Sequence, residues 1–412
     1  MNPAELKAWL RLTLSPGIGN GAARKLLAAF GSAQAVFEQS PARWAALGSS
    51  KLVKALQTEP PTLAGLLATT QAWLAGDHAA GAEGAEAAGV SGPTESDAPA
   101  TGQRRIVTLG DAAYPPSLLN IEDPPLMLYM LGVAVDWTPG DAESIANGTH
   151  CLAMVGSRNP TPQGAVNARQ FAQSFAQSGL TVVSGLALGV DGAAHDGALL
   201  GGGLTIAVVG TGLDRVYPKK HLALAHRIAA QGLIISEFPL GTPPLTANFP
   251  KRNRIIAGLC QGTLVVEAAL KSGSLITARL AAEQGKDVFA IPGSIHSPQS
   301  RGCHALIKQG AKLVENAQDV LEELKWPYLP ANGQSALSLS AEGDALDDSE
   351  GDEAAPDTAL LTAMGFDVVS LDALQARTGW PTPELQARLL ELELMGQVSR
   401  LPGGLFQRIS SA

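Results

Sequence analysis

The chain has 412 residues, of which 45% are hydrophobic and 16% are charged, and it carries a formal net charge of −9 at pH 7. That length suits two or three domains. The chain holds no apolar run of about 18 residues, and its first residues lack the basic start and apolar stretch of a secretory signal, so we expect neither a membrane span nor export. Its cysteines, Cys151, Cys260 and Cys303, are scattered and odd in number, which fits a reducing cytoplasm and predicts no metal or redox motif.

Much of the negative charge lies in two segments of low complexity. Residues 77–97 hold five acidic residues and residues 342–357 hold eight, and neither segment contains a lysine or an arginine. Removing these thirteen charges from −9 leaves +4 for the remainder, so the net charge does not argue against nucleic-acid binding. The composition predicts a flexible linker at 76–102 and an acidic linker at 329–356.

Residues 1–75 show the apolar spacing of short helices, with a glycine-rich turn at 15–21. A glycine-rich turn between two helices is typical of a small SAM-like or helix–hairpin–helix unit, whose backbone amides often grip DNA phosphate. Arg24 and Lys25 are the only cations near the turn. A DNA-gripping hairpin and a plain helical domain with an ordinary turn therefore both remain open.

The largest unit, residues 103–328, alternates short apolar runs with helix-compatible stretches. Proline-rich segments within 105–149 predict an extended lead-in to an edge strand. Apolar strands that alternate with helices are typical of a parallel sheet covered on both faces, so we predict an α/β, extended Rossmann-like fold. The expected strands are residues 150–155, 181–185, 204–209, 233–237, 263–267 and 287–291, and a last helix is expected at 319–324.

Residues 357–412 predict a compact winged helix. The pattern indicates three helices and a β-hairpin, at residues 359–364, 371–377, 383–395 and 398–408. The helix that would read DNA carries Arg388 against three glutamates. Both a DNA-reading and a protein-binding winged helix therefore remain open.

Glycine, serine and basic residues gather where the predicted strands end or in the loops just past them, and ligands of parallel α/β sheets bind at that edge. The first strand ends in Gly156, Ser157 and Arg158, whose backbone amides and planar guanidinium suit a phosphate. The complete set of expected phosphate ligands is Gly156, Ser157, Arg158, Ser184, Gly185, Gly210, Lys219, Lys220, Lys251, Arg252, Arg254, Ser272 and Ser274.

Two aromatic residues are interleaved with these cations. Tyr217 precedes Lys219 and Lys220, and Phe249 precedes Lys251. Cations that track phosphates beside rings that stack on bases are typical of proteins that bind single-stranded nucleic acid, so Tyr217 and Phe249 are the candidate base-stacking residues. A solvated basic rim without a ligand is the alternative.

Familiar catalytic motifs are missing from the sequence, which has no Walker A loop, no dinucleotide fingerprint, no zinc-protease motif and no nucleophile elbow. We expect no metal and no other cofactor. Asp191 and His195 could form a general-base pair on one helix face, but Asp191 also suits a helix start, where it complements the dipole. Glu267 ends a predicted strand, where it could be catalytic or could accept hydrogen bonds from loop amides.

A series of short motifs follows one order along the predicted sheet unit: Val155–Arg158, Ser184–Ala187, Asp191–His195, Gly210–Gly212, Tyr217–Pro218, Ser236–Glu237, Phe249–Leu259, Glu267–Ala268, Ser272–Ser274 and Ala290–Gly293. This series resembles the DprA/Smf family, and the helical N-terminal and winged-helix C-terminal units resemble flanking domains found in that family. The match is specific because many motifs recur in the same order.

The resemblance implies a DNA-processing protein of natural transformation. Such a protein is not an enzyme; it binds and protects incoming single-stranded DNA in the cytoplasm, forms a homodimer and loads the recombinase RecA. The resemblance also implies that Gly156, Ser157 and Arg158 form a phosphate loop and that Lys219 or Lys220 contacts DNA. His221 departs from the polar residue that relatives often carry.

Two other functions remain open. The glycine-rich strand ends also resemble nucleotide-processing enzymes of the phosphoribohydrolase type, in which Glu267 would act on the ribose, although their Pro-Gly-Gly-x-Gly-Thr run is missing. The third possibility is a scaffold that acts only through protein contacts of its terminal units, which the basic strand ends disfavour.

Overall fold

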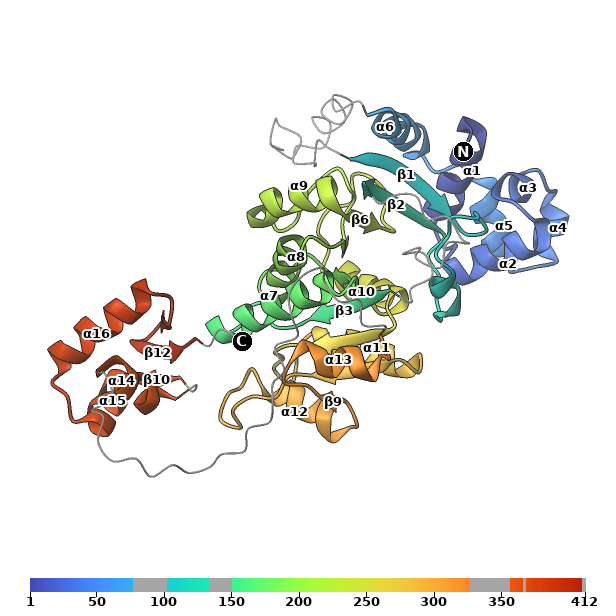
Figure 1. Ribbon diagram of the computed structural model, residues 1–412. Coiled ribbons are helices and arrows are strands. Elements are labelled where there is room, and N and C mark those ends of the chain that lie inside the picture. The colour runs from blue at the N-terminus through green and yellow to red at the C-terminus, as the bar shows by residue number, and fades with distance from the viewer. Residues whose placement is uncertain (77–101, 134–149, 327–355, 366–367, 410–412) are drawn as a thin grey trace.

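The computed structural model describes residues 1–76, 102–133, 150–326, 356–365 and 368–409, which form a helical, an α/β and a winged-helix unit (Figure 1). Apart from their outermost residues, the expected linkers at 76–102 and 329–356 lie outside this described part. Within it, no helix combines the length and the apolar character that crossing a bilayer requires.

The described residues of the α/β unit build a nine-stranded sheet in the order β1-β2-β6-β5-β4-β3-β7-β8-β9. The seven strands β6-β5-β4-β3-β7-β8-β9 pair in parallel, as expected. In contrast, β2 pairs antiparallel with both β1 and β6. The strands are β1 Gln103–Thr108, β2 Met127–Gly132, β3 Cys151–Val155, β4 Thr181–Ser184, β5 Thr205–Val208, β6 Leu233–Ser236, β7 Gly262–Val265, β8 Asp287–Ala290 and β9 Lys312–Leu313.

The segment before β3 contributes two strands, whereas the sequence indicated one edge strand with a lead-in. β2 is buried along its whole length and lies between β1 and β6, with Tyr129 opposite Ser236. A strand covered on both faces shows no apolar–polar alternation, so its pattern does not reveal how many neighbours it has.

Helices cover both faces of the sheet. Neighbouring strand residues point to opposite faces, so that Val182 packs under one helical layer and Val183 under the other. One layer contains α7 (Pro162–Gln177), α8 (Val190–Leu200), α9 (Leu222–Gln231) and α13 (Ala317–Glu323); the other contains η3 (Pro116–Asn120), α10 (Asn248–Leu259), α11 (Ser274–Glu283) and α12 (Arg301–Lys308).

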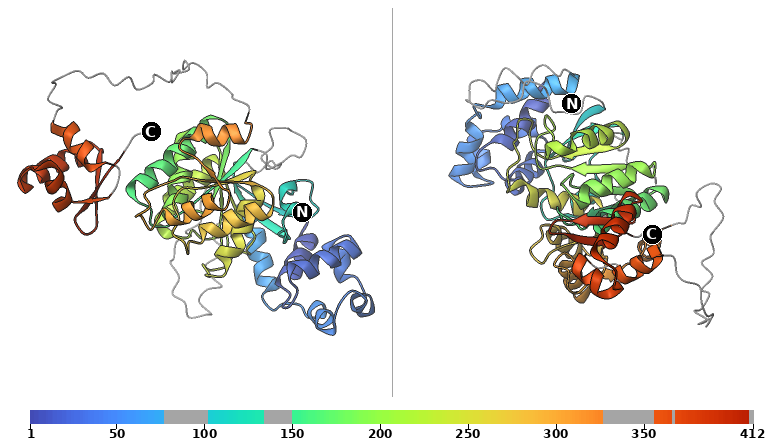
Figure 2. Two further views of the ribbon diagram at one scale, coloured as in Figure 1. Left: turned by 90° about the horizontal axis from the view of Figure 1, so that it is seen from below. Right: turned by 90° about the vertical axis from the view of Figure 1, so that its left-hand side faces the viewer.

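The N-terminal helices pack at one end of the sheet, beside β1 and β2 (Figures 1 and 2). One hydrophobic cluster runs from these helices to β2 and α9, and the Trp73 ring centre lies 6.1 Å from that of Tyr129. The helices are α1 Pro3–Leu14, α2 Asn20–Phe30, α3 Ala33–Phe37, α4 Pro41–Ala45, α5 Ser50–Gln57 and α6 Leu63–Ala75.

The C-terminal unit is a winged helix, as expected. It has a three-stranded sheet in the order β10-β12-β11 and a hydrophobic core of its own. Gly379, with φ of 71°, ends the second helix in the left-handed conformation. The elements are α14 Pro356–Met364, β10 Val369–Ser370, α15 Leu371–Thr378, α16 Thr382–Leu394, β11 Val398–Leu401 and β12 Leu405–Arg408.

Candidate nucleic-acid interface

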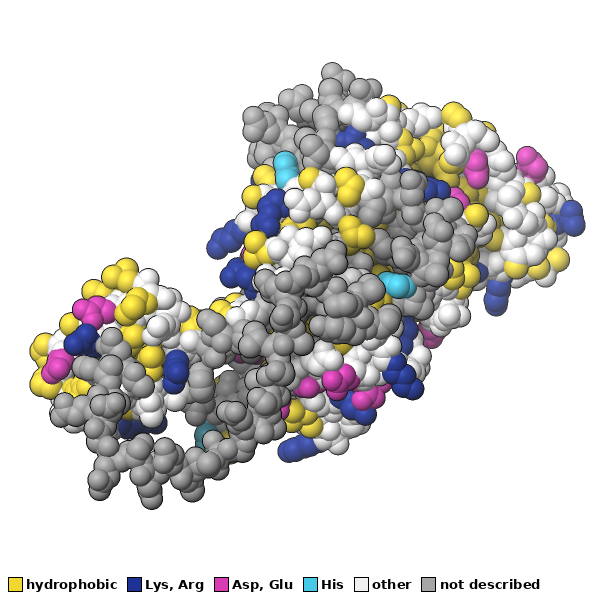
Figure 3. All heavy atoms as spheres, viewed as in Figure 1, with side chains coloured by type: hydrophobic (Ala, Val, Ile, Leu, Met, Phe, Trp, Pro, Cys, Tyr) yellow, Lys and Arg dark blue, Asp and Glu magenta, His cyan; other side chains and the backbone are white. Residues whose placement is uncertain are grey.

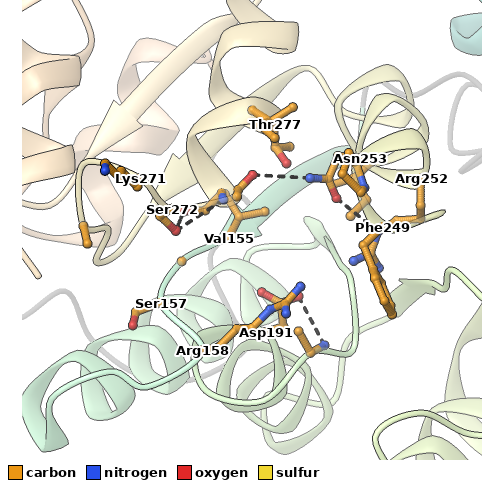
Figure 4. Close-up of a pocket in the computed structure, with 18 of the residues that line it drawn as sticks. Val155, Ser157, Arg158, Asp191, Phe249, Arg252, Asn253, Lys271, Ser272 and Thr277 are labelled. Atoms are coloured by element: carbon orange, nitrogen blue, oxygen red, sulfur yellow. Dashed lines mark hydrogen bonds between the residues drawn. The ribbon is translucent and has the colours of Figure 1, made fainter. Parts of the chain in front are cut away.

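A pocket of about 670 Å³ opens at the carboxyl ends of β3 and β7 (Figure 4). On one side β3 pairs with β4, which follows it in the chain, and on the other side it pairs with β7, which comes much later. This reversal of strand order is the topological switch point at which open α/β sheets bind ligands. The loop after β3, the start of α10 and the loop before α11 form the walls.

The loop after β3 brings Gly156, Ser157 and Arg158 to the pocket, as expected. A Cβ atom at Gly156 would lie 2.6 Å from the Val190 side chain, so glycine fits there best. Ser157 is buried, and its Oγ accepts a hydrogen bond from the Asn159 amide at 3.1 Å. Arg158 is exposed, and its guanidinium group lies at the mouth of the pocket. The buried residues of the loop hold it in place from beneath.

The basic run at 249–254 lies in the first turns of α10, and the expectation of a loop was therefore wrong. Pro250 fits because backbone amides in the first turn of a helix have no helical partner. Successive residues of a helix point about 100° apart, so neighbouring cations face different surroundings. Lys251 is exposed, whereas Arg252 is buried.

Arg252 joins elements beneath the pocket and is only 4% exposed. Its Nη1 donates hydrogen bonds to the carbonyl oxygens of Gly185, at 2.6 Å, and Val208. Asp191 belongs to the same buried network, since its Oδ2 accepts from the amides of Gly185 at 3.1 Å and Ala187 at 3.3 Å. Burial raises the pKa of Asp191 and lowers that of Arg252 to about 10, while the opposite charges partly offset both shifts. Arg252 is one of the residues that line the pocket, where it supports the floor, and its role as a phosphate ligand stays a prediction.

Two further expected ligands also face the interior. The Arg254 side chain is 14% exposed and forms ion pairs with Glu237 and, at 3.6 Å, with Asp123. Ser184 is fully buried, and its Oγ donates to the carbonyl oxygen of Met154 at 2.6 Å. Both side chains hold elements together, and these contacts give no support to their expected role as phosphate ligands.

Gly185 and Gly210 lie outside the pocket lining and allow side chains of α10 to approach closely. A Cβ atom would lie 2.3 Å from the Arg252 guanidinium at Gly185, and 3.1 Å from the Phe249 ring at Gly210. Both residues are buried. Their absent side chains therefore make room for α10 next to the strand ends.

Tyr217 and Phe249 lie side by side at the pocket. Their ring centres are 5.7 Å apart with an interplanar angle of 36°, and Tyr217 is 47% exposed. The guanidinium carbon of Arg158 lies 5.6 Å from the centre of the Phe249 ring. The structure thus brings a cation and two aromatic rings together, which is the combination that stacked bases and phosphates require.

The loop before α11 supplies a cation that the sequence analysis missed. Lys271 is exposed and lines the pocket with Ser272 and Ser274, whose Oγ atoms lie 2.7 Å apart. Its position directly before the Ser-Gly-Ser turn was the available signal. In Figure 4, Lys271 and Phe249 lie on opposite sides of the pocket.

Lys219 and Lys220 are exposed on the short helix η5 (Lys219–His221), just after Tyr217. Like Lys251, they lie outside the pocket lining, so they extend the basic surface around it. His221 points inwards, with its Nδ1 3.0 Å from the Leu186 carbonyl oxygen. The structure gives no reason to prefer one of the two lysines.

Asp191 and His195 have separate structural roles. His195 is fully buried, with its Nδ1 2.7 Å from Oγ1 of Thr205, and burial lowers its pKa to about 3. A histidine that stays neutral in the core cannot exchange protons with a substrate near pH 7. The interpretation of Asp191 as a residue of a helix start is confirmed, because it lies in the first turn of α8.

Glu267 accepts hydrogen bonds from the amide of Thr161 at 2.9 Å and from its hydroxyl at 2.6 Å. Thr161 is the N-cap of α7, so this carboxylate secures the start of that helix. Burial raises the pKa of Glu267, and the hydrogen bonds from Thr161 partly offset the rise. Glu267 is outside the pocket lining, and the described residues contain no His, Cys, Asp and Glu cluster that could hold a metal.

The N-terminal hairpin uses one of its two nearby cations within the protein. Arg24 donates to Oδ1 of Asp123 at 2.6 Å and to the Pro124 carbonyl oxygen at 3.2 Å, and Asn20 donates to Oδ2 of Asp123 at 3.0 Å. These bonds dock α2 on the α/β unit. The DNA-gripping interpretation of the hairpin therefore loses support.

Three family models match the chain: DNA recombination-mediator protein A over residues 105–325, the DprA-like N-terminal HHH domain over 3–59 and the DprA winged helix domain over 344–404. The chain is 45% identical to Protein Smf of Escherichia coli over 292 residues, which are 71% of this chain and 74% of that protein. It is 48% identical to the DNA processing protein DprA of Streptococcus pneumoniae over 216 residues, 52% of this chain and 73% of that one. The X-ray structure of DNA processing protein A from Streptococcus pneumoniae is similar with a TM-score of 0.60 and 35% identity, covering 78% of this chain and 98% of that chain.

Proposed function

The chain belongs to the DNA recombination-mediator protein A family of DNA-processing proteins, and on this premise we propose that it binds single-stranded DNA at the pocket between β3 and β7. The observation that carries the proposal is the convergence of Arg158 and Lys271 with the rings of Tyr217 and Phe249 around one pocket. The cations attract the phosphates, and the rings offer stacking surface to unpaired bases. A duplex keeps its bases stacked inside, so this arrangement favours single strands.

We also infer that the protein is not an enzyme. Asp191 is buried and bonded to amides, His195 is inside the core, and Glu267 is bonded to Thr161 away from the pocket. These contacts count against the phosphoribohydrolase-like alternative, which needs Glu267 near a bound ribose. They support a role for the pocket in holding a strand rather than in cleaving it.

We further propose that the protein protects incoming strands during natural transformation, acts as a homodimer and loads RecA in the cytoplasm. The support is family membership and the single-strand site. Two measurements test it: the mass of the protein in solution by sedimentation, and the lag before RecA hydrolyses ATP on single-stranded DNA. A monomeric mass would contradict the homodimer. A lag that the protein does not shorten would contradict the loading of RecA.

A salt titration of a labelled oligonucleotide tests the binding proposal. The wild-type protein should bind the single strand more tightly than the matching duplex, and log affinity should fall with log salt by about 0.7 for each phosphate neutralised. Arg158→Glu places a carboxylate at the mouth of the pocket and should lower the affinity about a hundredfold without unfolding the protein. Wild-type affinity in a folded Arg158→Glu variant would refute the assignment of the site.

A further inference from the structure

The third helix of the winged helix, α16, is apolar on two faces. One face points into the core of the C-terminal unit through the buried side chains of Leu385, Leu389 and Leu392. The other face is exposed and carries a row of apolar residues, here called the α16 stripe, made of Pro383, Ala387, Leu390 and Leu394. At about 100° per residue, the two sets point in roughly opposite directions. The core of the unit therefore leaves the second face uncovered.

The exposed apolar side chains of this face are large and close together. Leu390 is 57% exposed, Leu394 is 81% exposed, and Met395 at the end of the helix is 57% exposed. Large exposed apolar side chains in the rest of the described residues stand singly along the chain. Figure 3 shows the resulting apolar surface where α16 lies. Single exposed leucines are normal, whereas a group of them marks a surface that binds another protein.

The spacing of the α16 stripe is that of a helix that packs along another helix. Its residues follow one another at intervals of four, three and four, which is the repeat of positions a and d in a coiled coil. From Pro383 to Leu394 the stripe runs over about three helical turns. It therefore fits a second helix that lies along α16.

Acidic residues flank the α16 stripe on both sides. Glu384 and Glu391 occupy the neighbouring position e, and Glu393 occupies position g on the other side. Arg388 is the one cation of α16, and it lies 3.0 Å from Glu391. Charges at e and g decide which helices pair. Two copies of α16 would bring acidic flanks together, so the charge pattern disfavours self-pairing and favours a partner with Lys or Arg at these positions.

We propose that the α16 stripe binds a basic amphipathic helix of another protein. Apolar side chains of that helix pack along the stripe, and its Lys or Arg side chains lie beside Glu384, Glu391 and Glu393. The same glutamates repel phosphates, so the surface discriminates against nucleic acid. The inference goes beyond the proposed function, because it gives the C-terminal unit a partner at a surface that takes no part in strand binding.

Designed helical peptides test the inference on the full-length protein. The basic peptide carries leucine at a and d and lysine at e and g over about three heptads. Two matched peptides replace either the lysines by glutamates or the leucines by serines. By fluorescence anisotropy, the basic peptide should bind at least about tenfold more tightly than either of them. Equal binding of the serine peptide would overturn the inference, since it would mean that lysines are merely attracted to an acidic chain. Equal binding of the glutamate peptide would overturn it as well.

Matched variants place the peptide on α16. Leu390→Ser should weaken binding of the basic peptide by about tenfold, because it removes a leucine from the middle of the stripe. Leu200→Ser removes a leucine of the same 57% exposure at the end of α8 and should leave binding unchanged. Glu393→Lys should weaken the basic peptide and strengthen the glutamate peptide. Unchanged binding in folded Leu390→Ser would refute the placement. The comparison of peptides on the wild-type protein remains valid if a variant fails to fold.

Mass and strand binding of Leu390→Ser separate this inference from the proposed function. The variant should keep the mass in solution and the single-strand affinity of the wild-type protein. A lower mass would assign the α16 stripe to a second copy of the chain, and a loss of strand affinity would assign it to DNA. Either result would overturn the inference. Absence of single-strand binding by the wild-type protein would refute the proposed function alone.

Discussion

Two sets of charged residues lie at or beside the pocket. The outer cations are Arg158 and Lys271, which line it, and Lys251, which lies next to it, and the inner network is Arg252 with Asp191. Both sets come from the strand ends, loops and first helical turns around the same edge of the sheet, and Lys251 and Arg252 are adjacent in the chain. The outer cations are exposed, whereas Arg252 is 4% and Asp191 8% exposed. The inner network makes its bonds within the protein, so it contributes to the shape of the site while the outer cations provide the charge that DNA meets.

This difference shows that a count of basic residues in a motif does not measure a binding surface. A helix turns about 100° per residue, so one step along α10 separates a residue that meets solvent from one that is tied to Gly185 and Val208. Changes to outer cations should therefore reduce affinity at constant stability. Changes to the inner network should reduce stability first.

Arg252→Met should have the largest effect. It leaves the carbonyl oxygens of Gly185 and Val208 without their donor, and it removes the positive charge that favours the ionised form of the buried Asp191. A buried polar group that loses its partner typically costs about 1–3 kcal/mol. We expect the free energy of unfolding, measured in urea, to fall by about 3 kcal/mol. Arg158→Met removes the same charge from the outer set and should change it by less than about 0.5 kcal/mol. Equal losses of unfolding free energy in the two variants would contradict the distinction between the outer cations and the inner network.

Glu267→Gln should have a smaller effect, which depends on pH. Burial raises the pKa of Glu267 in the folded protein, so folding favours its protonated form. The stability that this group contributes is complete below its unfolded pKa and is lost as pH rises through the folded pKa. Glutamine does not titrate, so the variant should gain stability relative to wild type as pH rises from the unfolded pKa of Glu267 through its raised folded pKa, by about 1.4 kcal/mol per unit of that shift.

Urea unfolding of wild type and Glu267→Gln across this pH range provides the measurement. Glu283→Gln, at an exposed carboxylate on α11, is the control and should show no such trend. A stability difference that stays constant with pH would mean that Glu267 is as well solvated in the folded chain as in the unfolded one.

Much of the fold was predictable because buried parallel strands are apolar along their length and end at glycine or proline. The loop at Gly156–Arg158 was found for the same reason, since strand ends of a parallel sheet share an edge. The inward direction of Arg252 and Arg254 was not predictable, because the basic residues were placed at strand ends or in the loops just past them and not in a helix, so no helical register was available. The ion pair between Arg24 and Asp123 joins residues far apart in sequence, which no local pattern reveals.

Lys251→Gln should change affinity without changing stability. Lys251 is exposed in the first turn of α10, next to the pocket but outside its lining. If it neutralises one phosphate, the slope of log affinity against log salt should become shallower by about 0.7, and affinity should fall a few-fold at moderate salt. Lys54→Gln on the N-terminal unit is the control. An unchanged slope in Lys251→Gln would confine the DNA contact to the pocket.

The surface of the winged helix is a third region to compare, and its cation is paired within the helix, unlike the outer cations at the pocket. Arg388 on α16 lies 3.0 Å from Glu391, so its charge is already paired on the helix itself. The exposed apolar side chains of α16 and its end are Leu390 at 57%, Leu394 at 81% and Met395 at 57%. Hydrophobic side chains gather over α16 in the space-filling view (Figure 3). These features favour protein contact over DNA reading.

Arg388→Glu should therefore have the smallest effect on DNA binding. A recognition helix that reads duplex DNA uses unpaired cations to approach phosphates, and losing one would weaken duplex binding and flatten its salt dependence. Because Arg388 is paired with Glu391, we expect single-strand and duplex affinities to stay within about twofold of wild type. Lys271→Glu, an equal charge reversal at the pocket, should lower single-strand affinity tenfold or more under the same conditions. A selective loss of duplex affinity in Arg388→Glu would instead assign DNA reading to α16 and make the winged helix a second nucleic-acid site.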